Sequence, residues 1–345
     1  MKSRQNLPQV SIIVVNLNGK GLLPMCLESL QAQTYTHFEV ILVDNGSTDG
    51  SGDLVRQRYP WVKLVTLPDN VGFASGNNIG FEHASGAYIV TLNNDTKVDR
   101  NWLQELVWAA DSNPAVGMVA SRVVSFAEPD TIDSLGMLLC RDGMSRGAYR
   151  LQRFSTLPLG SIEDIFFPSA CAALYKRTML EQIGFFDDDF FAYCEDTDLG
   201  IRGRLAGWEA VVATKAITHH KYSQSGGTFS PFKLYLVERN HYWMVFKNFP
   251  LQRMVLLPYY TFLRYATQTK VVVSSHGAGH EFLSSASRSA CLKAILKGTY
   301  DAFVRLPAMY RKRKHVRTLK KLSQQQYYEL MKTYQLSFKE LLDAG

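Results

Sequence analysis

The stretch Phe38-Glu-Val-Ile-Leu-Val43, followed by Asp44-Asn-Gly-Ser-Thr-Asp49, reads as a buried strand that ends in a polar turn. Its run of aliphatic and β-branched residues predicts a strand, and the polar residues predict a turn into a helix. The same order occurs upstream, where Val10–Val15 precedes Asn16-Leu-Asn-Gly19 and a helical pattern at 22–33. Two successive units of this kind predict parallel strands covered by helices.

The pattern continues to about residue 120. Val62–Thr66 is expected to be a third strand, Gly72–His83 a helix, and Ala87–Leu92 a fourth strand that ends in Asn93-Asn-Asp95. The chain is therefore assigned to the α/β class, with a Rossmann-like, mainly parallel sheet flanked by helices. Ligands of such sheets bind beyond the carboxyl ends of the strands, where three of these four strands have polar clusters. Turns are also rich in these residue types, so the clusters alone leave both interpretations open.

After residue 120 the periodicity weakens, and residues 121–165 are expected to form hairpins and a flexible loop. The elements expected beyond them are a strand end and helix at Ala170–Ile183, a helix at Glu195–Leu205, a last short strand at Glu209–Ala213, and helices beyond Pro231. This order predicts a catalytic domain over 1–230, with a nucleotide-binding half at about 8–120 and an acceptor half at about 121–230. A helical, basic region would then occupy 231–345.

Composition supports a folded protein, with 46% hydrophobic and 20% charged residues in 345. The net charge of +7 is uneven: residues 1–246 carry 21 Lys and Arg against 26 Asp and Glu, and residues 247–345 carry 17 against 5. Five single cysteines disfavour a disulfide framework or a zinc site and suit a reducing compartment. No signal peptide is visible, and the longest apolar stretch, Met254–Leu263, is about half of the ~20 residues that a spanning helix needs. We expect a protein that is soluble or bound to one membrane face.

Two acidic motifs could carry chemistry. Asp95 follows a strand, where a carboxylate can hold a divalent metal against a diphosphate, although a turn aspartate is the simpler interpretation. Glu195-Asp196-Thr197-Asp198 places three carboxylates in four residues, as a general base or as acids in the first turn of a helix.

Other polar residues are weaker signals. His219-His220 could complete a metal site or lie on the surface, and Asp44 and Asn45 could bind a base or ribose. The glycines of Asn70–Gly80 permit close approach of backbone to a ligand, but their spacing is not a dinucleotide fingerprint. No P-loop or nucleophile elbow is present.

Together these segments resemble family-2 glycosyltransferases of the GT-A fold, particularly the bacterial rhamnosyltransferase-like branch. The resemblance covers about residues 8–250, and the ordered set of motifs is specific. The segments that carry it are Val10–Asn18, Ile41–Gly50, Asn70–Gly80, Leu92–Thr96, Cys194–Leu199 and His219-His220.

The resemblance implies roles for particular residues. Asp44 resembles the nucleobase contact, Asp95 the last aspartate of the DxD motif that binds metal and diphosphate, and Asp196 the catalytic base. Asn93 stands where the first aspartate of that motif often stands. His219 matches the metal-ligand histidine, with His220 as the alternative. The candidate donor-binding residues are Asn16, Asn18, Asp44, Asn45, Asn70, Gly76, Asn77, Asn94 and Asp95.

The implied activity is inverting transfer from a nucleotide sugar, with Mg²⁺ or Mn²⁺, to a glycan or polyprenyl-linked acceptor in polysaccharide or lipopolysaccharide synthesis. dTDP-L-rhamnose is one candidate donor. A non-catalytic protein that binds nucleotide sugars or glycans is the alternative.

The basic region 247–345 favours contact with the inner face of the cytoplasmic membrane, with packing on the catalytic domain or a homodimer as alternatives. Nucleic-acid binding is disfavoured because the first half is acidic and no nucleic-acid-binding motif is present.

Overall fold

The structure is a computed structural model that describes residues 10–221, 230–273 and 288–342. Parts of the expected catalytic domain (1–9 and 222–229) and of the C-terminal region (274–287 and 343–345) lie outside these residues. The strands are β1 Val10–Asn16, β2 Phe38–Asn45, β3 Lys63–Leu67, β4 Tyr88–Leu92, β5 Thr96–Val98, β6 Val116–Ser125, β7 Ile132–Ser134, β8 Met137–Leu139, β9 Ser145–Gly147, β10 Ile162–Asp164, β11 Ala172–Lys176 and β12 Glu209–His220. The helices are α1 Leu23–Gln31, α2 Ser51–Arg58, α3 Gly72–Glu82, α4 Trp102–Asp111, α5 Arg177–Ile183, α6 Glu195–Leu205, α7 Pro231–Asn248, α8 Leu251–Val255, α9 Leu257–Val273, α11 Arg288–Val304, α12 Leu306–Leu319, α13 Gln324–Thr333 and α14 Phe338–Leu342, with short 3₁₀ turns η2 Phe154–Thr156 and η3 Asp188–Phe190.

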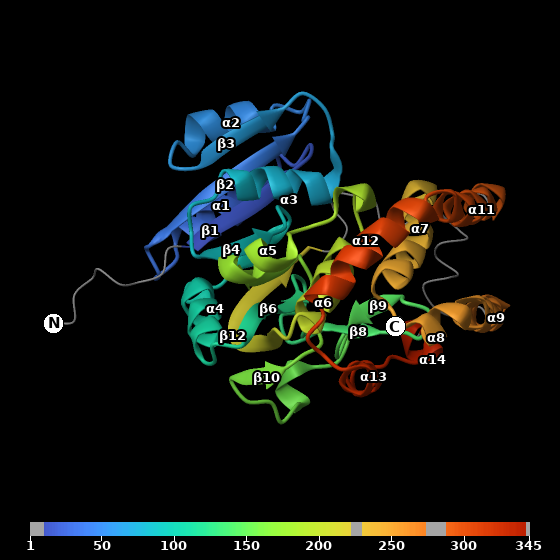
Figure 1. Ribbon diagram of the computed structural model, residues 1–345. Coiled ribbons are helices and arrows are strands. Elements are labelled where there is room, and N and C mark those ends of the chain that lie inside the picture. The colour runs from blue at the N-terminus through green and yellow to red at the C-terminus, as the bar shows by residue number, and fades with distance from the viewer. Residues whose placement is uncertain (1–9, 222–229, 274–287, 343–345) are drawn as a thin grey trace.

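One large sheet runs through the molecule in the order β10-β12-β6-β11-β4-β1-β2-β3 (Figure 1). The four strands expected from the first part of the sequence form its parallel half: β1 pairs in parallel with β2 and β4, and β2 with β3. The polar ends of β1, β2 and β4 therefore meet at one edge of the sheet. The predicted α/β class is confirmed.

The second half of the sheet differs from the sequence prediction. β6 lies within the region expected to hold hairpins and a loop, yet it is a ten-residue strand of which eight residues are buried. A strand covered on both faces has no alternation of polar and apolar residues, so the period-2 signal is absent. β11 runs antiparallel between β4 and β6 and joins the two halves.

The last strand is longer than predicted. β12 continues past Ala213, through a register shift before Ile217, and ends at His220 instead of before the two histidines. Its final residues pair with β5, His220 opposite Thr96. Because successive side chains on a strand point to opposite faces, His219 and His220 face different surroundings.

Helices cover both faces of the sheet. Apolar residues of α1, α2 and α4 pack on one face, and those of α3, α5 and α6 pack on the other. A third apolar cluster joins α6 to α7, α12 and α13, with Trp243 and Phe249 fully buried in it. Figure 1 shows the C-terminal helices grouped on one side of the sheet, beside α6. No helix within the described ranges is both long and apolar enough to cross a bilayer.

Candidate active site

The carboxyl ends of β1, β2 and β4 bring three predicted donor-binding residues into contact. Asn16 donates from Nδ2 to Oδ1 of Asp44 (3.4 Å) and to the Ser47 hydroxyl (3.2 Å), and Oδ1 of Asn16 accepts from Asn94 (2.8 Å). All three predicted residues are buried. Gly19 lies over them so closely that a Cβ there would approach Asn16 Oδ1 to 2.3 Å. The group is fixed before any ligand arrives.

Asn18, Asn45 and Asn70 organise the loops around this group. Asn18 has a left-handed φ of 51°, and its Oδ1 accepts from the backbone N–H of Thr48 (2.8 Å). Asn45 donates to Oδ1 of Asn70 (3.0 Å) and accepts from the Val71 N–H (2.9 Å). Asn45 and Asn70 therefore tie the end of β2 to the start of α3.

The contacts of Gly76 and Asn77 are made with the protein itself, and neither residue bonds to the group at Asn16 and Asp44. A Cβ on Gly76 would lie 3.0 Å from Cγ1 of Val15, so this glycine lets α3 pack closely on β1. The buried Asn77 donates to the carbonyl of Phe73, one turn back in its own helix (2.9 Å). Sequence spacing alone does not distinguish a glycine that meets a ligand from one that meets a neighbouring strand.

Asp95 faces His220, the alternative choice of histidine, and not His219. Oδ1 of Asp95 is 3.4 Å from Nε2 of His220, is fully buried and has no hydrogen-bond partner among the described residues. His219 points to the other face of β12, where its Nε2 is 3.0 Å from Asp99. The Lys221 N–H donates to the Asp95 carbonyl (3.0 Å) and holds the end of β12 against this loop.

Two residues of this group were missed from the sequence. Asp133 contacts Nδ1 of His220 (2.9 Å), and the half-buried thiol of Cys171 also contacts the ring. Burial acts to lower the pKa of His220, but Cys171 and the carboxylates of Asp133 and Asp95 together raise it above its usual value. Asp133 lies on a three-residue strand in the weakly patterned region, so nothing local marks it. A carboxylate behind the second ring nitrogen is a common arrangement for histidine ligands of metals.

Asp196 lies beside this group through the start of β11. Its Oδ2 accepts from the N–H of Ala170 (3.2 Å), and the next residue, Cys171, contacts His220. The Cys171 carbonyl in turn accepts from the N–H of Asn93 (2.9 Å). Asp196 is partly exposed, and burial raises its pKa above the usual value for aspartate. A carboxylate that holds protons more tightly is suited to act as a general base.

The other carboxylates of the acidic motif have different surroundings. Asp198 is fully buried and accepts from Arg202 (2.8 Å), Lys247 (2.8 Å) and Asn248 (2.8 Å). Burial favours its neutral form, but Lys247 and Arg202 outweigh this effect and hold the pKa of Asp198 well below its usual range. Arg202 also donates to the carbonyl of Ile183 (2.6 Å), which gives it a structural role. Asp198 anchors α6, whereas Asp196 stays partly exposed beside Ala170.

Glu195 should make stability depend on pH in a way that its glutamine variant does not. Burial, and then the neighbouring Asp196, raise the pKa of Glu195 to about 8, whereas an unfolded chain has about 4.3. Between these values the folded state keeps a proton that the unfolded state releases, so the unfolding free energy falls as pH rises through this window. Glu195→Gln removes the ionisation.

We expect the variant to match the wild type below about pH 4 and to become more stable than it as pH rises to 8, by up to about 1.4 kcal/mol for each unit of pKa shift. Denaturant unfolding at pH 5, 6.5 and 8 measures this difference, with the exposed Glu82→Gln as control. A stability difference that is the same at all three pH values would contradict the assignment.

Two curated proteins are similar to much of the chain. The chain is 34% identical over 232 residues to the O-antigen biosynthesis protein RfbC of Myxococcus xanthus, a match of 62% of this chain but only 17% of that protein. It is 30% identical over 246 residues to the N-acetylglucosaminyl-diphospho-decaprenol L-rhamnosyltransferase of Mycobacterium tuberculosis, covering 62% of this chain and 77% of that protein.

Solved structures share the fold. The mannosyltransferase PcManGT of Pyrobaculum calidifontis, solved with GDP-Man and Mn²⁺, superposes with a TM-score of 0.53 at 17% identity, over 91% of this chain and 86% of that chain. Residues 1–349 of S. aureus TarS, solved with UDP, give a TM-score of 0.52 at 16% identity, over 94% and 91%. These likenesses confirm the predicted GT-A architecture. The sequence model described as "Glycosyl transferase family 2" matches residues 11–184, half of the chain, and the protein belongs to that family.

Proposed function

We propose that this family-2 glycosyltransferase moves a sugar from a nucleotide sugar to a hydroxyl group of a lipid-linked or glycan acceptor, with inversion at the anomeric carbon. The observation that carries the proposal is the buried Oδ1 of Asp95, which lies 3.4 Å from Nε2 of His220 and has no other hydrogen bond or ion pair in the described part of the chain. Such an atom needs a cation or a donor to offset its desolvation. It lies between the donor-binding group at Asn16 and Asp44 and the carboxylate of Asp196.

The residues around Asp95 fit a divalent cation. They supply a carboxylate oxygen and an imidazole nitrogen, and Asp133 sits behind the ring as a second-sphere acceptor. No cluster of three or more His, Cys, Asp or Glu side chains suited to a metal occurs in the described part of the chain. We infer that Asp95 and His220 hold the cation and that the donor diphosphate completes its coordination. When bound, Mg²⁺ or Mn²⁺ offsets the negative charge of the leaving diphosphate.

The protein residues divide the remaining work. Asp44, Asn16 and Asn18 position the nucleoside at the ends of β1 and β2. Asp196 accepts the proton of the acceptor hydroxyl as its oxygen bonds to the anomeric carbon, and the bond from that carbon to the diphosphate oxygen breaks. One displacement from the face opposite the leaving group inverts the configuration, so one carboxylate at the reacting carbon suffices.

The similar proteins suggest the substrate class. The names of two of them specify an L-rhamnosyltransferase acting on a decaprenol-linked sugar and a protein of O-antigen biosynthesis. We propose a polyprenyl-linked acceptor at the inner face of the cytoplasmic membrane, with dTDP-L-rhamnose as the first donor to test.

Calorimetric titration tests the site. Purified protein is titrated with nucleoside diphosphates and their sugars in Mn²⁺, Mg²⁺ or EDTA. We expect one nucleotide to bind in a metal-dependent manner and Asp95→Asn to remove that dependence. His220→Gln should weaken metal-dependent binding at least about tenfold, the scale seen even for residues that only orient a ligand. Its control is His219→Gln, which should leave binding unchanged because His219 faces Asp99. Equal effects of the two histidine variants, or binding indifferent to EDTA, would refute the assignment.

A further inference from the structure

A cavity of about 370 Å³ lies where the end of α6, the turn between α7 and α8, and helices α12 and α13 meet. We call it the basic cavity. Lys247, Arg313, Arg317 and Lys320 line it, and none of its described lining residues is Asp or Glu. It is separate from the candidate active site. Leu205 at its wall is nine residues along α6 from Asp196, about 14 Å at 1.5 Å per residue.

Three of the four cations have no counter-ion among the described residues. Lys247 is paired with Asp187 (2.6 Å) and Asp198 (2.8 Å). Within the described ranges, Arg313, Arg317 and Lys320 have no carboxylate at ion-pair distance. Arg313 is only 7% exposed, and its one protein acceptor in those ranges is the Phe246 carbonyl (2.9 Å). Burying a guanidinium beside other cations costs free energy unless an anion joins them.

A buried hydroxyl of the cavity wall also lacks a partner in the part of the chain that the structure describes. It belongs to Tyr327, a residue that is 1% exposed. Buried polar groups are normally bonded, so such a hydroxyl indicates a ligand that accepts its proton. This observation is independent of the charge count and indicates the same kind of ligand, an anion with several acceptor oxygens.

Two of the basic residues lie on one face of α12, and the third directly follows its end. Arg313 and Arg317 are four residues apart in the helix, and Lys320 comes three residues later, just after α12 ends at Leu319. Arg311 and Lys314 of the same helix are exposed and do not line the cavity. The cluster is therefore a feature of one face and not of the whole basic segment.

An exposed apolar surface begins at the mouth of the cavity. Leu251 lines the cavity and is 62% exposed, and Val255, one turn on, is 72% exposed. Tyr259 and Phe262 continue the same spacing along α9 and are also more than half exposed. We call these four residues the apolar stripe. Exposed apolar side chains beside cations are typical of surfaces that meet lipid.

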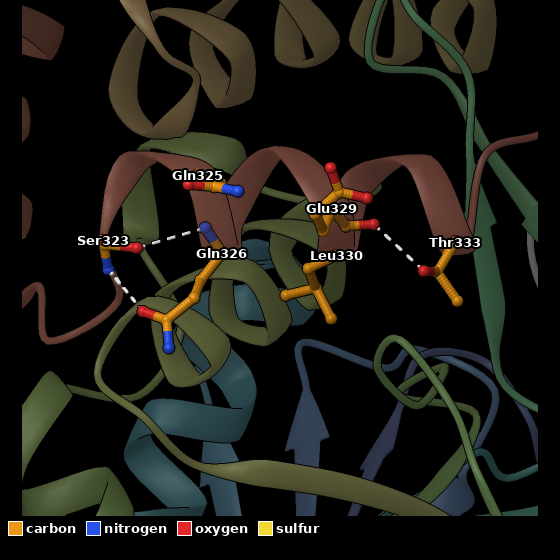
Figure 2. Close-up of a pocket in the computed structure, with 6 residues that line it drawn as sticks. All are labelled: Ser323, Gln325, Gln326, Glu329, Leu330 and Thr333. Atoms are coloured by element: carbon orange, nitrogen blue, oxygen red, sulfur yellow. Dashed lines mark hydrogen bonds between the residues drawn. The ribbon is translucent and has the colours of Figure 1, made fainter.

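A second hollow, on α13, lacks the features that indicate a binding site in the basic cavity. It has about 410 Å³ and is lined by residues of α13 and its cap alone (Figure 2). Ser323 and Gln326 bond each other's backbone as a capping box, and the Thr333 hydroxyl donates to the Glu329 carbonyl (3.0 Å). Its hydroxyl groups are already bonded within the helix, and its one charged lining residue is an acid.

We propose that the basic cavity binds the phosphate or diphosphate group of a membrane lipid whose hydrocarbon chain lies along the apolar stripe. The inference deepens the proposed function, since it rests on an enzyme that works at a membrane on a lipid-linked acceptor. Free phosphate or diphosphate shares the headgroup chemistry but does not use the apolar stripe. Self-association is disfavoured because residues 247–345 carry 17 basic against 5 acidic residues and would repel a second copy.

The first test is calorimetric titration of the full chain with inorganic pyrophosphate, at fixed ionic strength in EDTA. Arg317→Gln with Lys320→Gln should weaken binding at least about tenfold, because charged hydrogen bonds are lost. The matched control, Arg311→Gln with Lys314→Gln, removes the same charge from the other face and should leave affinity within about twofold. Equal weakening by both double variants would overturn the cavity as a site, and so would an absence of binding to the wild type.

The second test distinguishes lipid from free phosphate. Co-sedimentation is measured with vesicles of phosphatidylcholine alone and of phosphatidylcholine with phosphatidylglycerol. The wild type should bind the anionic vesicles, and the cavity double variant should lose most of this binding. Val255→Ser with Phe262→Ser should lose vesicle binding yet keep pyrophosphate binding. Vesicle binding unaffected by either double variant would overturn the lipid assignment and leave free phosphate as the ligand.

One further variant separates this inference from the catalytic assignment. Asp95→Asn should lose metal-dependent nucleotide binding and retain binding of pyrophosphate in EDTA and of vesicles. If instead Asp95→Asn abolishes pyrophosphate binding, the anion lies in the donor site and the cavity proposal fails. If nucleotide binding never depends on metal but the cavity variants behave as expected, the donor-site assignment fails alone.

Discussion

Asp196→Asn should lower kcat by about 10²–10⁴-fold, the range that a positioned general base contributes, while the donor binds as before. The substitution keeps the size of the side chain and its acceptor oxygen, so the contact with the Ala170 N–H can persist. It removes the group that takes the hydroxyl proton. Steady-state rates with the donor identified by calorimetry measure the first effect, and titration of that donor measures the second.

The pH profile of the wild type gives an independent check. Because burial raises the pKa of Asp196, the fraction in the basic form falls as pH falls through a value above that of an ordinary aspartate. The acid limb of log kcat/KM should therefore lie above about pH 4, with activity lost on its low side. Asp99→Asn is the control, since the Asp99 carboxylate contacts His219, which points away from Asp95. A variant of Asp196 that keeps rates within about threefold of wild type would exclude it as the base.

The sequence is most informative where local pattern decides structure. The strands at β1, β2 and β4 are short apolar runs that end in polar clusters, and parallel pairing brings those ends together by geometry alone. For this reason the sequence alone predicts that Asn16, Asp44, Asn94 and Asp95 lie at one edge of the sheet. Helix α6 also spans Glu195–Leu205, as predicted.

What could not be predicted depends on pairing between distant residues. β12 extends to His220 because its last residues pair with β5 and β6. No feature of the sequence near Ala213 predicts that extension. That extension, by fixing the alternation of the strand, decides which histidine meets Asp95. Asp133 is 87 residues away from His220 and reaches it only through the fold. The contact of α7 with the turn before Asp196 also joins residues distant in sequence, so it could not be predicted. Helix α7 lies outside the segment matched by the family model.

Helix α7 holds the turn that presents Asp196. Just before α6 the chain contains Phe191 (φ 64°), Tyr193 (φ 69°) and Cys194 (φ 67°), three residues in the left-handed region that side chains disfavour. Asn240 of α7, fully buried, donates to the carbonyls of Phe190 (2.9 Å), Ala192 (2.8 Å) and Tyr193 (2.8 Å). Strained residues cost about 1–3 kcal/mol each and persist only when their surroundings over-determine them. One amide group supplies much of that constraint here.

Asn240→Ala should therefore lower kcat by about tenfold or more, because a misplacement near 1 Å at the base is enough to slow the reaction strongly. The KM for the donor should change little, since Asp44 and Asn16 lie on other strands. Asn77→Ala is the matched control: it removes an equally buried amide that bonds only within α3, so it should reduce stability while kcat is retained. Unfolding curves for both variants separate stability from rate. If both variants lose equal stability and equal kcat, Asn240 acts only through the stability of the core. If kcat falls for Asn240→Ala alone, α7 is part of the catalytic apparatus. Its packing on α6 is then what keeps Asp196 in place.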